Sequence, residues 1–125
     1  MKQTIRRLPD AELEVMQALW SFPESATRAQ LEEKLQSTHP MAPTTLLTLL
    51  NRLGEKGCVE AQKQGRTVYY RPLISEKEYL ASQSHRFIQK LCGGNLKTFA
   101  NALCDSGLSK EDLQQLRQLL ESDEL

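Results

Sequence analysis

The sequence predicts a mainly α-helical protein with one small β-hairpin, and three observations lead to this fold class. Apolar residues recur at helical spacing in three stretches before Gly57, two alternating segments surround Gly65, and further helical stripes follow. Three helices and then a hairpin is the order of a winged helix-turn-helix, whose third helix enters the DNA major groove while the hairpin holds the flanking backbone. We therefore expect a winged helix-turn-helix domain over residues 1–74 and a three-helix dimerisation region over residues 75–125.

The first two helices are predicted from their ends. One begins at Pro9 and Asp10 and is stopped by Pro23. The second follows an N-cap at Ser25 or Thr27, because a hydroxyl there can accept a hydrogen bond from a free backbone N–H of the first turn. Two prolines in "STHPMAP" then break helical continuity.

The third helix is expected over residues 44–56, within "PTTLLTLLNRLGEKG", and it has two opposed faces. Its apolar stripe consists of Leu46, Leu49, Leu50 and Leu53. Its opposite face is polar and consists of Thr44, Thr45, Thr48, Asn51 and Arg52. Leu47 fits neither face cleanly, and the expectation is either contact with a thymine methyl or plain exposure.

The polar face of this helix suits DNA. Short hydroxyls can bond phosphate oxygens or base edges, arginine can pair with phosphate or guanine, and few carboxylates are present to repel the backbone. The hairpin wing, residues 58–73, is expected to carry Lys63 and Arg66 at its tip, where a wing needs cations. Each feature alone is typical of a solvated surface, and winged helices also serve as protein-interaction modules. Their conjunction favours DNA binding.

Composition and charge narrow the function classes. The formal net charge is zero, but residues 41–74 carry five basic side chains against two acidic ones. Neither a secretory signal nor an apolar run of about 18 residues is seen, so the expected location is the cytoplasm, on the nucleoid. No catalytic set and no metal-ligand spacing appears, so neither an enzyme nor a cofactor or metal is expected.

The helices of residues 75–125 are expected to pair two copies of the chain, although their apolar stripes could instead fold back on the first domain as core. A single winged helix reads few base pairs, whereas a two-fold pair doubles the contacts and predicts a palindromic operator. The expected dimerisation residues are Leu80, Phe87, Leu91, Leu96, Phe99, Leu103, Leu113, Leu116 and Leu120.

The three cysteines are Cys58, Cys92 and Cys104, an odd number without CxxC spacing, which argues against a disulfide framework and a zinc site. They are expected to be small buried residues in a reducing compartment. The alternative hypothesis is a redox-responsive regulator, in which Cys92 or Cys104 pairs across the dimer and alters the spacing of the DNA-binding units.

The stretches "LPDAELEVMQALW", "PTTLLTLLNRLGEKGCVEAQKQGRTVYYRPL" and "LSKEDLQQLRQLL" resemble the penicillinase and methicillin-resistance repressors of the BlaI/MecI type. The resemblance covers nearly the whole chain. It implies a homodimeric repressor that binds a dyad operator, with Thr45, Thr48 and Arg52 on the recognition-helix pattern of that family.

The resemblance also bears on release from DNA. Some members are inactivated by proteolysis at an Asn-Phe bond in the dimerisation region, which implies a sensor-linked protease as a partner. The matching pair here is Asn101-Ala102, which keeps the asparagine and loses the phenylalanine. Copper-responsive relatives carry paired CxC motifs near the C-terminus, and "LLESDEL" has none. Proteolytic release is therefore a hypothesis, and release by copper is unsupported.

Overall fold

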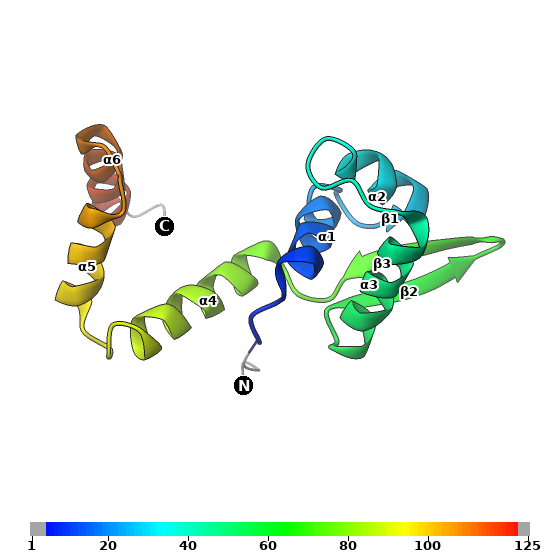
Figure 1. Ribbon diagram of the computed structural model, residues 1–125, viewed down its shortest axis with the longest axis horizontal. Helices are drawn as coiled ribbons and strands as arrows, with labels where there is room; N and C mark the ends of the chain where they lie inside the picture. Colours follow the sequence, from blue (N-terminus) through cyan, green and yellow to red (C-terminus); the bar gives the residue numbers. More distant parts are fainter. Residues whose placement is uncertain (1–4, 123–125) are drawn as a thin grey trace. The chain divides into compact units, whose positions relative to one another are not determined.

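The structure is a computed structural model that describes residues 5–122 of the chain, and it divides between Gln83 and Ser84 into two compact units. The expected class, mainly helical with a small hairpin, is confirmed (Figure 1). The elements are α1 (Asp10–Trp20), β1 (Ala26–Thr27), α2 (Arg28–Leu35), α3 (Pro43–Glu55), β2 (Val59–Gln64), β3 (Thr67–Pro72), α4 (Glu76–Lys90), α5 (Leu96–Asp105) and α6 (Lys110–Glu121).

Hydroxyl caps set the starts of three helices. Thr27, rather than Ser25, caps α2: its hydroxyl accepts from the Gln30 amide at 3.2 Å, and the Gln30 side chain accepts from the Thr27 amide at 2.8 Å. Ser75 and Ser109 form the same reciprocal box at the starts of α4 and α6. These local bonds explain why the helix starts are readable from the sequence.

The core of the N-terminal unit is built from α1, α2, α3 and the base of the hairpin. The four leucines of the α3 stripe are at most 6% exposed. Burial of a leucine side chain stabilises a fold by about 1.5–3 kcal/mol, so the stripe fixes the rotation of α3 about its own axis. Its polar face is thereby turned to the surface.

The hairpin belongs to a three-stranded antiparallel sheet in the order β1-β3-β2. β1 is a two-residue strand that pairs with Tyr69 and Tyr70. At the other end, Gly65 takes a positive φ of 65° in the two-residue turn between β2 and β3, as a type II′ turn requires of its first residue. The tip of the hairpin projects beyond the helices of its unit (Figure 1).

The first half of α4 contributes Tyr79 to the core of the N-terminal unit. The Tyr79 hydroxyl accepts from the buried Leu8 amide at 3.0 Å, and its ring lies 5.8 Å from that of Trp20. Trp20 in turn donates from its indole nitrogen to the Ile74 carbonyl at 2.9 Å. These contacts tie the residues before α1 and the start of α4 to one another.

The second unit contains the end of α4 together with α5 and α6. Phe87 and Phe99 meet edge to face, with ring centroids 5.8 Å apart, and Cys92 is buried. Several large apolar side chains of this unit remain on its surface, and the most exposed are Leu91, Leu96 and Leu120. The unit therefore has a small core and a large uncovered apolar surface.

Candidate nucleic-acid interface

The polar face predicted for the third helix is exposed. The structure places Thr44, Thr45, Thr48, Asn51 and Arg52 together on the outer side of α3, opposite the buried stripe. No acidic residue lies in the first turn of α3. The face thus offers hydroxyl, amide and guanidinium groups over its first turns, and its carboxylate, Glu55, is at the C-terminal end of the helix.

The N-terminus of α3 adds backbone donors to this face. Its N-cap is Ala42, which has no side chain to bond the amides of the first turn, and the first backbone bond across this end is from the Leu46 amide to the Ala42 carbonyl. Free amides at a helix start, together with the helix dipole, favour an anionic oxygen. The amides of Thr44 and Thr45 are therefore available to a phosphate.

The hydroxyl of Thr48 is already engaged within the helix. Its Oγ1 donates to the Thr44 carbonyl at 2.9 Å. The hydroxyl proton is therefore committed, and Thr48 offers its oxygen lone pairs and its methyl group to a ligand. In this arrangement Thr48 cannot also donate to a phosphate oxygen.

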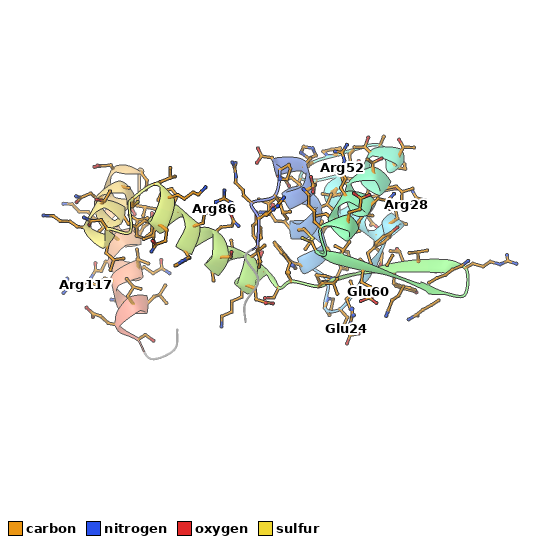
Figure 2. The ribbon with its side chains drawn as sticks, turned by 90° about the horizontal axis from the view of Figure 1, so that it is seen from below. Glu24, Arg28, Arg52, Glu60, Arg86 and Arg117 are labelled. Atoms are coloured by element: carbon orange, nitrogen blue, oxygen red, sulfur yellow. The ribbon has the colours of Figure 1, made fainter. Side chains whose placement is uncertain are left out.

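The wing carries its cations at the exposed end. Lys63 pairs with Val68 one step before the turn and Arg66 is in the turn itself, and both side chains are exposed. Nearer the base, Arg71 donates to Glu60 across the strands at 2.8 Å, and this guanidinium lowers the pKa of the Glu60 carboxyl. Figure 2 shows Arg52 on α3 and Glu60 on the hairpin. The carboxylate of the wing is thus neutralised locally, and the cations at its tip stay uncompensated.

Sequence reasoning missed a buried ion pair behind the interface. Among the described residues, Glu12 is the charged residue that is buried. Its carboxylate accepts a hydrogen bond from Lys56, the residue directly after α3, at 2.6 Å. The spacing of residues in the sequence could have indicated this pair. Glu12 is the first residue of a helical stripe that continues with Val15, Met16 and Leu19. An acid on a stripe that faces a core requires a cationic partner.

The residues expected to serve dimerisation lie in α4, α5 and α6. Five of them are exposed, namely Leu80, Phe87, Leu91, Leu96 and Leu120. The other four are half-buried, namely Phe99, Leu103, Leu113 and Leu116. Leu80 is in the part of α4 that belongs to the N-terminal unit, and the other eight are in the second unit. The half-buried members are all in α5 and α6, whereas the three in or directly after α4 are all exposed.

The cysteines and the expected cleavage site have distinct surroundings. Cys58 and Cys92 are buried, as expected, but the expectation of burial is wrong for Cys104, which is exposed on α5. Burial raises the pKa of the Cys58 thiol. Asn101 and Ala102 are both exposed within α5.

Within residues 5–122, no group of three or more histidine, cysteine or acidic side chains could hold a metal ion. In the same residues, no helix is long and apolar enough to cross a membrane.

Comparison with known proteins decides the family. A family model described as penicillinase repressor matches residues 8–122. The penicillinase repressor of Bacillus licheniformis is 36% identical over 118 residues, which cover 94% of this chain and 91% of that protein. The chain belongs to the penicillinase repressor family. This confirms the resemblance drawn from the motifs, and members of this family are transcriptional repressors rather than enzymes.

Other relatives and solved structures agree with this family. The methicillin resistance regulatory protein MecI of Staphylococcus aureus is 28% identical over 114 residues, which cover 90% of this chain and 92% of MecI. The solution structure of the DNA-binding domain of the repressor BlaI is 37% identical, covers 63% of this chain and 94% of that chain, and has a TM-score of 0.53. The monomeric form of BlaI in complex with the blaP half-operator matches with the same identity and coverage at 0.52. The fold of the N-terminal unit is therefore a winged helix.

Proposed function

We propose that the protein is a homodimeric transcriptional repressor that binds a palindromic operator through helix 44–56 and the hairpin wing 58–73. The observation that carries this proposal is the pair of opposed faces of α3, one buried as a leucine stripe and one exposed, polar and without a carboxylate in its first turn. Membership in a family of DNA-binding repressors supports the same function. Its expected place of action is the nucleoid in the cytoplasm.

The interface residues have separate roles in this proposal. Thr44 and Thr45 bind a phosphate through their amides and hydroxyls, Asn51 and Arg52 reach base edges or the backbone, and Thr48 accepts from a base donor. Lys63 and Arg66 hold the backbone beside the recognised groove. Phosphate contacts fix position, whereas the contacts of α3 with base edges supply the sequence preference.

Dimerisation is proposed for residues 75–125, with residues 1–74 binding DNA. The uncovered apolar surface of the second unit supports it, because Leu91, Leu96 and Leu120 are each more than 60% exposed in the single chain. Exposed leucines of this kind commonly mark a protein interface. Two-fold pairing would place two copies of α3 on successive turns of the duplex.

Release from DNA is proposed to follow proteolysis between Asn101 and Ala102 by a sensor-linked protease. The exposure of both residues supports access. Their position inside α5 requires local opening of that helix before the bond can enter a protease in extended form. Cleavage would remove the end of α5 and all of α6 from the rest of the dimerisation region and weaken pairing.

A redox-responsive regulator remains the second candidate, favoured by the exposure of Cys104 in the proposed dimerisation region. Cys92 is buried, so a disulfide between two copies would have to form first through Cys104. Non-reducing electrophoresis after mild oxidation distinguishes the two: a band of twice the chain mass that is absent in Cys104→Ser supports the redox hypothesis, and an unchanged monomer band ends it.

The main proposal is tested by binding of the full chain to DNA from the region upstream of its own gene. Arg52→Ala and Arg66→Ala should each weaken binding and lower the slope of log affinity against log salt by about one for each phosphate that the variant no longer neutralises. Arg117→Ala is the matched control, since Arg117 is on α6 in an exposed pair with Glu121. If Arg52→Ala and Arg66→Ala bind with the affinity and salt slope of the unaltered chain, the assignment of α3 and the wing is wrong.

A further inference from the structure

Leu47 is a large exposed apolar side chain beside the polar face of α3, and neither the fold nor the proposed contacts account for it. It is 42% exposed, although the other four leucines of this helix are at most 6% exposed. Its helical neighbours are Thr44, three residues before it, and Asn51, four residues after it, and both are exposed. Leu47 thus interrupts a polar surface instead of extending the core.

The adjacent Thr48 does not provide a hydroxyl donor next to Leu47. Because its hydroxyl proton is bonded to the Thr44 carbonyl, Thr48 has no hydroxyl donor left for a base edge, and its methyl group remains. Thr48 points about 100° away from Leu47 around the helix axis, so Leu47 is the side chain that presents hydrocarbon at this position. In the major groove, the hydrocarbon group that distinguishes one base from another is the C5 methyl of thymine.

Spacing along the helix places this spot close to Asn51. One helical turn rises about 5.4 Å, and successive base pairs are about 3.4 Å apart along the duplex. Leu47, four residues before Asn51 and about 6 Å from it along the helix axis, therefore lies within about two base pairs of the one that Asn51 would contact. An asparagine pairs well with adenine, and the thymine opposite that adenine carries its methyl on the same groove edge.

We infer that Leu47 is a specificity-determining contact that reads a thymine methyl in each half of the operator. This rests on the proposed binding of α3 in the major groove. The partner is the C5-methyl group of thymine in double-stranded DNA. Burial of one methyl group against a leucine favours thymine over a base without the methyl by about fourfold for each half-site.

The test uses the full chain and a duplex selected by it from a random-sequence library, made by synthesis so that its cytosines are unmethylated. Each thymine is replaced in turn by deoxyuridine, which removes the methyl and leaves base pairing unchanged. We expect replacement of one particular thymine in both half-sites to weaken binding by about fifteenfold, and the remaining replacements to have little effect. The Leu47→Ala variant should bind the thymine and deoxyuridine duplexes with equal affinity.

Two controls keep the outcome specific to Leu47. Leu73→Ala removes a leucine of similar exposure, 46%, from the residue after β3, and this variant should retain the full deoxyuridine penalty. Arg52→Ala should bind every duplex more weakly and also retain it. A deoxyuridine penalty that persists in Leu47→Ala overturns the inference while leaving DNA binding intact, whereas failure to select any duplex overturns the proposed function itself.

Discussion

The ammonium group of Lys56 lies 2.6 Å from a carboxylate oxygen of the buried Glu12 and joins the first turn of α1 to the residue that follows α3. The Glu12 side chain is 3% exposed and that of Lys56 is 39% exposed. The charge of Glu12 therefore depends on Lys56 for its solvation. The pair fixes the end of the proposed recognition helix against the core.

Lys56→Met should destabilise the fold more than the exposure of Lys56 implies. It leaves the Glu12 carboxylate buried without a partner, and removal of one member of a buried pair costs about 3–5 kcal/mol, less here because Lys56 is partly solvated. The double variant Glu12→Leu with Lys56→Met should recover most of the loss. Urea unfolding followed by the fluorescence of Trp20, the single tryptophan of the chain, measures both. Equal stability of the single and double variants would contradict this role.

Tyr79→Phe should lower the free energy of unfolding by about 1–3 kcal/mol. The substitution keeps the ring contact with Trp20 but leaves the buried Leu8 amide without the acceptor that it now has at 3.0 Å. Tyr69→Phe, in the half-buried part of β3, is the control and should change stability little. The same unfolding experiment compares the two variants. If Tyr79→Phe loses no more stability than Tyr69→Phe, the hydrogen bond between Tyr79 and the Leu8 amide does not stabilise the fold.

Leu96→Asp and Leu120→Asp should each convert a dimer into a folded monomer. Both leucines are at least 66% exposed in the single chain, so a carboxylate there disturbs pairing and not the internal core. Analytical ultracentrifugation should show twice the chain mass for the unaltered protein and for the control Leu73→Asp. If the unaltered chain is monomeric at micromolar concentration, the dimer proposal fails.

Arg71→Ala should raise the pKa of Glu60 toward its ordinary value, because the hydrogen bond and the charge of Arg71 hold it low. A carboxyl whose pKa is lowered on folding stabilises the fold above its unfolded pKa, and this stabilisation is lost as the pH falls through the lowered value. The wing of the variant should lack that acid-dependent loss. A side-chain NMR titration of Glu60 in both proteins measures this change in pKa. An unchanged titration curve would mean that Arg71 and Glu60 do not form an ion pair in solution.

Cys104 should react first with a thiol reagent near neutral pH. It is exposed, whereas Cys58 and Cys92 are buried and burial raises the pKa of the Cys58 thiol, so little reactive thiolate forms there. Absorbance with a disulfide reagent should show one fast thiol in the folded chain and none in Cys104→Ser. Three equally fast thiols would mean that the core opens readily.

Much of the fold followed from the sequence because its determinants are local. The predicted third helix, residues 44–56, matches α3 to within one residue at each end, and the box of Ser109 with Asp112 is a bond between near neighbours. The two faces of α3 were also predictable, since four leucines at helical spacing leave one orientation in which all are buried.

The features that escaped prediction depend on partners far along the chain. β1 is only two residues long and exists because Tyr69 and Tyr70 offer it a strand edge. Glu12 looks like an ordinary acid of a first helical turn until Lys56, 44 positions later, is brought beside it. The exposure of Cys104 depends on how α5 and α6 pack, which apolar spacing alone leaves open.

The short pairing of β1 makes the wing unequal along its length. Tyr69 and Tyr70 have strand neighbours on both sides, whereas Thr67 and Val68 pair with β2 alone. β1 therefore holds the middle of β3, and the hairpin has no third strand near Gly65, so its backbone amides should exchange hydrogen fastest toward that end. In the proposed complex with DNA, such a wing would let Arg66 follow the local width of a groove while α3 keeps its position.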